Sequence, residues 1–174
     1  MSEVSVVPDP AKFFDALALS PIAAAQHYPI LLVSKDAIPA ATQSVIDQFD
    51  PETVVGGGGP MTVSATVKNS LGALRWYGSS RYTTAITVAN NAISRGWLSD
   101  SAVGIAAKLP DALTGGGVIG RMGGVLLLTN GDTLTTETGN WIAAHKGNIT
   151  NCYIFGGPNS VKSGVVSAVK AKLQ

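Results

Sequence analysis

Glycine-rich turns are the first places in this sequence where a ligand could bind. Gly56–Gly59 and Gly156-Gly157 each follow an apolar run and precede a Val-rich, helix-like stretch. Backbone N–H groups in such a turn, at the start of a helix, can hold an anion such as phosphate. Neither turn has the Gly-Lys-Ser/Thr of a P-loop or the Gly-x-Gly-x-x-Gly of a dinucleotide site. The glycines therefore predict tight structural turns, with an anion-binding role as the alternative for Gly57, Gly58, Gly156 and Gly157.

Three charged residues stand where helices are expected to begin. Asp15 and Asp111 can each cap the free N–H groups of a helix start, worth about 1 kcal/mol. Arg81 can pair with one of these carboxylates, which we favour, or can hold an anionic ligand with its guanidinium fork. The neighbouring Tyr82 is expected to pack at the start of the same helix.

Signatures of catalysis are missing from the sequence. His27 and His145 are the only histidines, and neither has a second His, a Cys or a carboxylate at metal-ligand spacing. No serine stands in a Gly-x-Ser-x-Gly elbow. The single cysteine, Cys152, lies in an apolar run and is expected to be an inert core thiol. We therefore predict a binding protein without catalytic residues, metal or cofactor.

Charge excludes some partners and favours others. Residues 1–75 carry a net charge of −3, and residues 76–174 carry +4. No run of basic residues with interleaved aromatics occurs, so nucleic-acid binding is not expected. No apolar run reaches the roughly 20 residues of a membrane span, and the first residues lack the features of a signal peptide, so an export signal is expected outside this sequence. The second half is the better candidate for binding an anion, with Arg81, Arg95, Lys108, Arg121 and Lys146.

Apolar runs alternate with amphipathic stretches along the whole chain. Val161, Val165, Val169 and Leu173 recur every four residues, as on one face of a helix, and an earlier stripe runs Val63, Val67, Leu71 and Leu74. The expected strands are short and mostly β-branched or Leu, as in strands buried on both faces: Val4–Val7, Ile30–Val33, Thr53–Val55, Ala102–Ala106, Val125–Leu128 and Tyr153–Phe155. This alternation predicts an α/β fold, a mainly parallel sheet or sheets with helices on both faces in a Rossmann-like, three-layer arrangement.

An internal repeat divides the chain. Asp15-Ala16-Leu17 matches Asp111-Ala112-Leu113 at an offset of 96 residues, and Gly58-Gly59-Pro60 matches Gly156-Gly157-Pro158 at 98. We expect one complete repeat over residues 75–174, preceded over residues 1–74 by a repeat that has lost its opening. The helix expected at Tyr82–Ser94 has no counterpart before the first repeat.

These blocks resemble the cell wall-binding repeat 2 family. The family pattern Gly-x-x-Arg-Tyr-x-Thr-Ala is met by Gly78 to Ala85, and the Asp-Ala-Leu blocks, the double glycines and Pro29-Ile30-Leu31-Leu32 also fit. The resemblance implies a non-catalytic, extracellular module that holds a Gram-positive surface protein or autolysin on the cell wall. Its partner would be an anionic polysaccharide or a teichoic-acid-like polymer. The candidate contacts are Asp15, Gly57, Gly58, Arg81, Tyr82, Lys108, Asp111, Arg121, Gly156 and Gly157.

Two other functions stay open at this point. The chain could be an assembly module that packs against other copies and touches polymer little, or an α/β enzyme with a small molecule at the carboxyl ends of its strands. The missing opening helix would leave an apolar face on the first repeat, and such faces are unusual on soluble monomers. We therefore also expect self-association through the first repeat.

Overall fold

Strands and helices alternate from end to end in the computed structural model, which describes residues 3–8 and 14–174. The first part contains β1 (Glu3–Pro8), α1 (Phe14–Gln26), β2 (Ile30–Val33), α2 (Ala40–Phe49), β3 (Thr53–Gly57), α3 (Ala65–Ser70) and β4 (Leu74–Trp76). The second contains α4 (Arg81–Ser94), β5 (Ala102–Ala106), α5 (Leu109–Arg121), β6 (Val125–Leu128), α6 (Thr136–His145), β7 (Asn151–Phe155) and α7 (Ser163–Leu173). The predicted α/β alternation is confirmed.

The strands form two separate, fully parallel sheets. The first has the order β2-β1-β3-β4 and the second β6-β5-β7. In each, the first strand of the repeat lies in the centre, with the second strand on one side and the third on the other. The shared order confirms that the chain is built from two copies of one unit. Within the described residues, the first sheet has a fourth strand, β4, and the second sheet has three strands.

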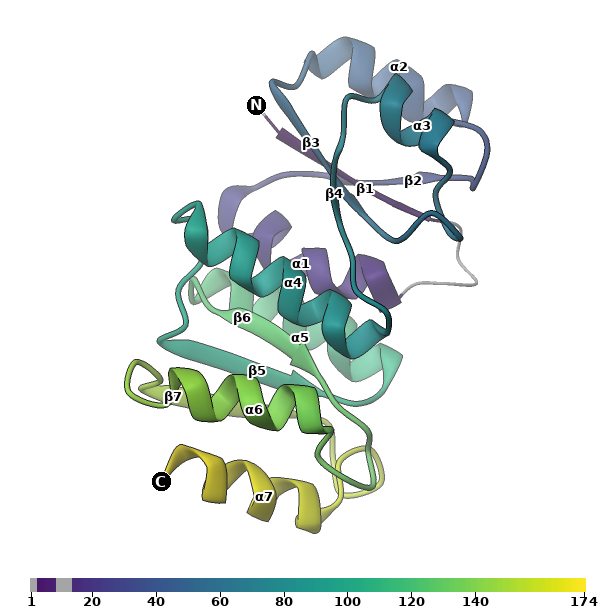
Figure 1. Ribbon diagram of the computed structural model, residues 1–174. Coiled ribbons are helices and arrows are strands. Elements are labelled where there is room, and N and C mark those ends of the chain that lie inside the picture. The colour runs from purple at the N-terminus through teal and green to yellow at the C-terminus, as the bar shows by residue number, and fades with distance from the viewer. Residues whose placement is uncertain (1–2, 9–13) are drawn as a thin grey trace.

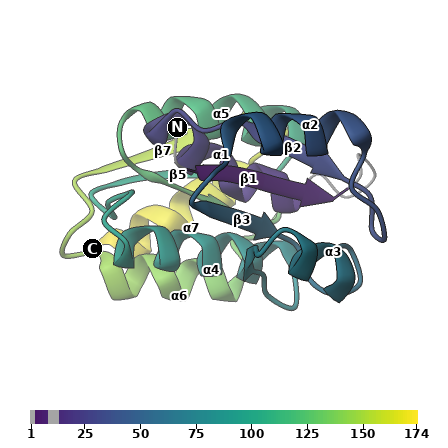
Figure 2. The same ribbon diagram turned by 90° about the horizontal axis from the view of Figure 1, so that it is seen from above.

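Helices cover the sheets on both faces and fill the space between them. The two sheets lie one above the other in Figure 1, with α1, α4 and α5 at the level between them. Seen from above, α5 lies on one side of the strands, and α4 and α6 lie on the other (Figure 2). The predicted three-layer arrangement is therefore present, although it is divided between two sheets.

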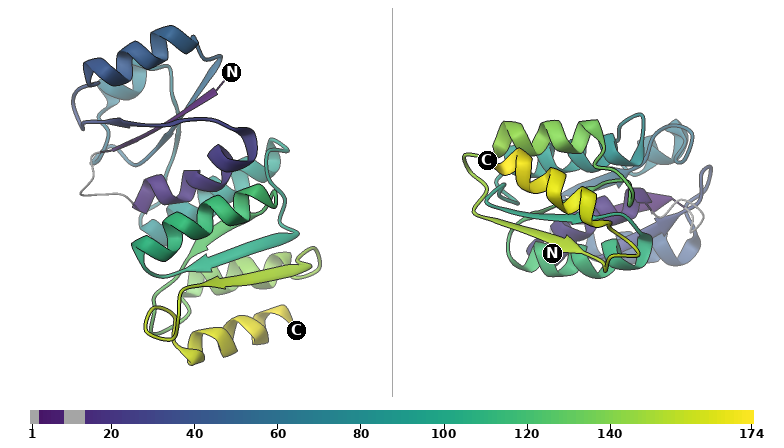
Figure 3. Two further views of the ribbon diagram at one scale, coloured as in Figure 1. Left: turned by 180° about the vertical axis from the view of Figure 1, so that it is seen from behind. Right: turned by 90° about the horizontal axis from the view of Figure 1, so that it is seen from below.

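The two repeats share one hydrophobic core through the packing of α1 against α5. These helices are repeat equivalents and lie side by side between the first sheet and β5 (Figure 3). Leu17, Leu19 and Ile22 of α1 are buried in the same cluster as the strands of the second sheet. Close approach is possible because α5 presents Gly116 and Gly120 to α1. The two repeats therefore form one packed body.

Strand β4 corrects one expectation from the sequence. The stripe from Val63 to Leu74 predicted a single helix, but α3 covers only Ala65–Ser70 and Leu74 lies in β4. Leu74 pairs with Val55 and Trp76 with Gly57, so β4 extends the first sheet. Gly72, with a φ of +59°, makes the turn that ends the helical segment. The proposed boundary between residues 74 and 75 falls inside this strand.

Strand β2 is less fully covered by helices than its counterpart β6 in the described part of the chain. In the second repeat, α4 packs on β6, all of whose residues are buried. The first repeat has no counterpart of α4 within residues 3–8 and 14–174. Leu32 of β2 is consequently 40% exposed, whereas Leu128 at the equivalent position of β6 is 2% exposed. The uncovered face of β2 is therefore the exposed side around Leu32, since Ile30 packs against the core, and self-association through this face stays a prediction.

Candidate functional site

The carboxyl ends of the strands gather most of the predicted contact residues. The strands of both sheets run in the same general direction, from left to right in Figure 1, so their carboxyl ends share one side of the molecule. The residues there end a strand, follow a strand or begin a helix: Asp15, Gly57, Gly58, Arg81, Tyr82, Lys108, Asp111, Gly156 and Gly157. We call this side the carboxyl edge.

A cavity of about 390 Å³ opens at the carboxyl edge between the two repeats. Its walls come from the start of α1, the turn after β3 and the segment between β4 and α4, and include Asp15, Gly59, Tyr77 and Arg81. Tyr77 is 44% exposed, and its ring packs so closely on Gly59 that a Cβ there would lie 2.9 Å from Tyr77 Cδ2. The cavity therefore combines a fixed aromatic face with charged groups and hydroxyls. We call it the junction cavity.

The start of α4 is built to hold one wall of the junction cavity. Ser80 is the N-cap, and its Oγ accepts a hydrogen bond from the Thr83 backbone N–H while Thr83 Oγ1 accepts one from the Ser80 N–H. The Gly78 N–H donates to Thr84 Oγ1 at 3.0 Å. These bonds fix the loop that carries Tyr77 and the first turn that carries Arg81, because such capping removes unsatisfied N–H groups.

Arg81 is held by its neighbour. Its Nη2 donates a hydrogen bond of 2.9 Å to Tyr82 Oη, and its guanidinium carbon lies 5.0 Å from the centre of the Tyr82 ring. Tyr82 itself packs against the core, as expected. Arg81 and Asp15 line the same cavity. Their predicted pairing stays a prediction.

The glycines at the carboxyl edge have a clear structural role. Gly58 and Gly156 occupy equivalent positions and have nearly the same φ, +118° and +115°, which residues with a side chain rarely adopt. A Cβ at Gly57 would lie 2.9 Å from Leu19 and 3.1 Å from the Asp15 carbonyl oxygen. The tight-turn interpretation therefore accounts for Gly57, Gly58 and Gly156, and Gly157 adjoins the same turn.

Internal contacts occupy several charges at the carboxyl edge of the second repeat. Lys108 Nζ donates to the Asn159 carbonyl oxygen at 2.7 Å. Lys162 Nζ lies 2.6 Å from Asp132 Oδ1, and this hydrogen bond, with the Lys162 charge, holds the pKa of Asp132 below its usual value. Asp111 Oδ2 lies beside Gly156. Asp132 and Lys162 were not candidates from the sequence, although Asp132 stands just after a strand, where such a contact could have been suspected.

Arg121 lies at the opposite edge of the molecule, at the last turn of α5. It lines a cavity of about 400 Å³ with Gln26, His27 and Trp97. Arg95 and Lys146 also stand at helix ends, as the C-caps of α4 and α6, where a cation offsets the negative end of the helix dipole. The positive charge of the second repeat is therefore divided between two edges, and only Arg81 and Lys108 of the predicted set lie at the carboxyl edge.

Aromatic residues near the repeat junction were not singled out from the sequence. Trp76 and Trp97 have ring centres 5.7 Å apart, and the Arg95 guanidinium carbon lies 5.7 and 5.2 Å from them, respectively. Their neighbour Tyr77 faces the junction cavity. Tyr77, just before Gly78 in a segment without helical spacing, was the available signal, because binding residues are often found in loops.

The described residues offer few other reactive groups. Burial raises the pKa of Cys152 to about 11, in agreement with an inert thiol. Across residues 3–8 and 14–174, no three His, Cys, Asp or Glu side chains come together as metal ligands. None of the helices in the described ranges is long and apolar enough to span a membrane.

Comparisons with known proteins agree with this architecture. Residues 3–68 and 75–166 each match the model of a family described as cell wall binding domain 2. The chain is 34% identical over 161 residues to the N-acetylmuramoyl-L-alanine amidase LytC of Bacillus subtilis (strain 168), covering 91% of this chain and 31% of that protein. It therefore spans less than a third of this curated relative's length.

Two solved structures from Clostridium difficile share the fold. Cwp6 superimposes with a TM-score of 0.77 at 22% identity, and Cwp8 with 0.77 at 21%. The similarity covers 98% of this chain in both cases, but 27% of Cwp6 and 29% of Cwp8.

Proposed function

Because the chain belongs to the cell wall binding domain 2 family, in which both of its repeats are matched, we propose that it anchors a larger protein non-covalently to an anionic cell-wall polymer. A cell wall binding domain acts at the cell surface, and the two family matches are the observation that carries the proposal. The polymer would be an anionic polysaccharide or a teichoic-acid-like chain on a Gram-positive wall. Amidase activity is not transferred from LytC, because the chain covers 31% of that protein.

The junction cavity is the proposed contact site for one unit of the polymer. The exposed ring of Tyr77 offers a flat apolar surface of the kind that sugar rings stack on, and Gly59 supports it from behind. Ser79 lines the same space, and its hydroxyl can replace a hydrogen bond that a sugar makes to water. The hydroxyls of Thr62 and Ser80 already bond to the Gly59 carbonyl oxygen and the Thr83 N–H. Arg81 adds a guanidinium, which favours a phosphate or carboxylate on the polymer.

A repeated fold suits a repetitive ligand. Once one unit of a polymer is bound, the next contact is intramolecular and gains from a high effective concentration. The carboxyl edge continues from the junction cavity to Lys108 and a second cavity of about 270 Å³. A polymer bound along this edge would therefore contact both repeats. Several weak contacts together would give a higher overall affinity than any one of them.

Cosedimentation with purified cell walls tests the proposal. The protein should pellet with intact walls and should largely remain in solution with walls stripped of their anionic polymers. Raising the salt concentration from 0.05 to 0.5 M should reduce the pelleted fraction, because exposed charges are screened. Equal binding to intact and stripped walls, or binding insensitive to salt, would exclude an anionic polymer as the partner.

Self-assembly is the second candidate function, and the exposed Leu32 on the uncovered face of β2 favours it. In this alternative, the chain associates with other copies through the first repeat. It is compatible with wall binding, because the residues of β2 do not line the junction cavity.

A further inference from the structure

A groove beside β7 and α7 is open, although its counterpart in the first repeat is filled. The open groove has a volume of about 460 Å³ and is lined by Ile154, Gly156, Val161 and Val166, among others. The positions 98 residues earlier, Gly56, Gly58, Val63 and Lys68, line a cavity of only about 10 Å³. The same site in the repeated unit is thus occupied in one copy and vacant in the other.

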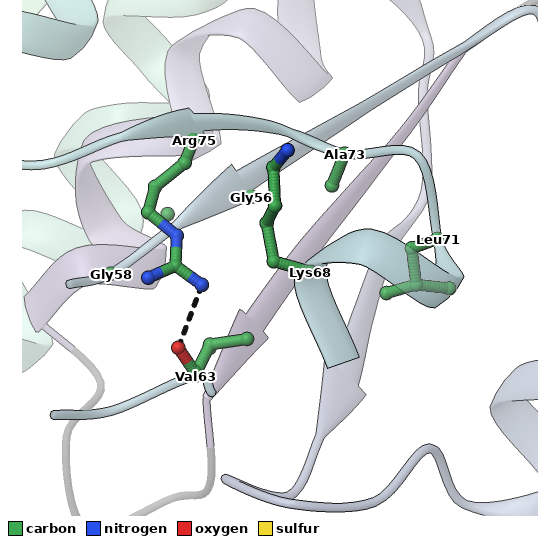
Figure 4. Close-up of a pocket in the computed structure, with 8 residues that line it drawn as sticks. Gly56, Gly58, Val63, Lys68, Leu71, Ala73 and Arg75 are labelled. Carbon is green, nitrogen blue, oxygen red and sulfur yellow. Dashed lines mark hydrogen bonds between the residues drawn. The ribbon is translucent and has the colours of Figure 1, made fainter. Parts of the chain in front are cut away.

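Strand β4 fills the site in the first repeat. It pairs in parallel with β3, from Val55 with Leu74 to Gly57 with Trp76. Arg75 reaches across the end of the groove, and its Nη2 donates to the Val63 carbonyl oxygen at 2.8 Å (Figure 4). The same Nη2 also donates to the Ser64 carbonyl oxygen at 3.0 Å. The Gly58 N–H donates to the Trp76 carbonyl oxygen at 3.4 Å. Backbone pairing and one arginine therefore close the groove.

The equivalent edge of β7 has no strand beside it in the described part of the chain. β7 pairs with β5, and its other edge is free among residues 3–8 and 14–174. Tyr153 is 37% exposed and Asn151 is also exposed, whereas Val54 and Val55 of β3 are buried. A free edge of this kind is a ready template for a further strand.

We propose that the groove beside β7 is the docking site for the connecting strand of a further repeat of this kind. The first repeat defines the chemistry of the occupant, because β4 leads directly into α4 of the next repeat. The occupant is an extended segment with an aliphatic residue, an arginine and an aromatic residue in succession, as in Leu74-Arg75-Trp76. It adds in parallel to β7, and its arginine donates to the carbonyl oxygens of Val161 and Lys162.

Nuclear magnetic resonance of the whole chain with a synthetic peptide tests this inference. The peptide carries residues 71–80 of this chain, which contain β4, and is titrated to millimolar concentration into ¹⁵N-labelled protein. Amide shifts should concentrate on Asn151–Gly156 and on Val161 and Lys162. A peptide with Arg75→Ala should bind at least about tenfold more weakly, because it loses two charge-assisted hydrogen bonds.

A matched pair of variants controls for general effects of the peptide. Ser167→Trp places a bulky ring in the groove and should abolish the shifts. Ser94→Trp makes the same change at an exposed position at the end of α4 and should leave them unchanged. Each variant is checked for native folding by its own spectrum.

Four outcomes would overturn the inference. They are no shifts at millimolar peptide, shifts centred on the edges at β2 or β6, equal binding of the Arg75→Ala peptide, and equal binding to the Ser167→Trp variant. Shifts at β7 caused by protein concentration alone would assign the groove to a second copy. Shifts there caused by wall polymer would assign it to that ligand.

Discussion

Gly120 of α5 lies so close to Pro21 of α1 that a Cβ at position 120 would collide with the Pro21 backbone. Gly116, one turn earlier, lies against Ser20, where a Cβ would meet the Ser20 side chain. The residues of α1 equivalent to these glycines are Ser20 and Ala24, which are also small. Small residues on both helices thus allow the two repeats to share a core.

The α1–α5 contact predicts a large effect from a single methyl group. Gly120→Ala should lower the free energy of unfolding by about 1–3 kcal/mol, because neither backbone can move without disturbing the core. The control is Gly117→Ala, where a Cβ would meet no atom of the described residues within 4 Å. That change should raise stability by about 0.5–1 kcal/mol, since alanine favours a helix. Urea unfolding followed by circular dichroism compares them, and equal stabilities would contradict the tight contact.

The exposed position of Tyr77 predicts that its side chain matters for wall binding and little for the stability of the fold. Tyr77→Ala should weaken wall binding about fivefold to tenfold, because the stacking surface of the junction cavity is lost, while the unfolding midpoint changes little. Tyr153→Ala removes another exposed tyrosine, on β7, and should leave wall binding unchanged. Cosedimentation with purified walls measures both. Equal losses in the two variants would mean that the junction cavity is not the contact site.

The burial of Cys152 predicts that its thiol is alkylated slowly in the folded state. With a pKa raised from 9.0 to about 11, the thiolate fraction at pH 8 is about a hundredfold below that of an ordinary thiol, and alkylation should be at least that much slower than in urea. The folded state holds this proton more tightly than the unfolded state, so its contribution to stability is present below pH 9 and is lost as pH rises toward 11. Rapid labelling of the native protein by iodoacetamide at pH 8 would contradict the burial.

The sequence predicted the repeated unit well, because each expected strand is a short apolar run between turns. It failed at β4, since Leu74 stands three residues after Leu71, a spacing that also fits the helical face of Val67 and Leu71, and a three-residue strand has too little periodicity of its own. Only pairing with β3 reveals it.

The sequence indicated some of the residues at the carboxyl edge and missed others. Asp15 and Arg81 stand at helix starts in the sequence, and the structure brings them to one edge because parallel strands bring their carboxyl ends together. Arg121 was grouped with them by charge, but charge carries no information about which end of a helix faces which edge. Tyr77 lines the junction cavity with its ring packed on Gly59. The sequence does not reveal that contact, because it depends on the turn after β3.

The uncovered face of β2 predicts concentration-dependent association. Sedimentation over a hundredfold concentration range should show a growing dimer or larger species in the wild type. Leu32→Asp should remove it, because a charge at this partly exposed position cannot be buried in an apolar contact. Leu113→Asp, at a 58% exposed position of α5, should not. A wild type that is monomeric at the highest concentration would end this prediction.

Binding of purified anionic wall polymer to two charge-matched double variants is the most direct test of the central claim. Arg81→Ala with Lys108→Ala removes two cations from the carboxyl edge, and Arg95→Ala with Arg121→Ala removes two from the opposite edge. Titration at low salt should show binding by the wild type, a loss of at least about tenfold in the first variant, and a change of less than about twofold in the second. Loss of binding only in the second variant, or in neither, would contradict a polymer site at the carboxyl edge.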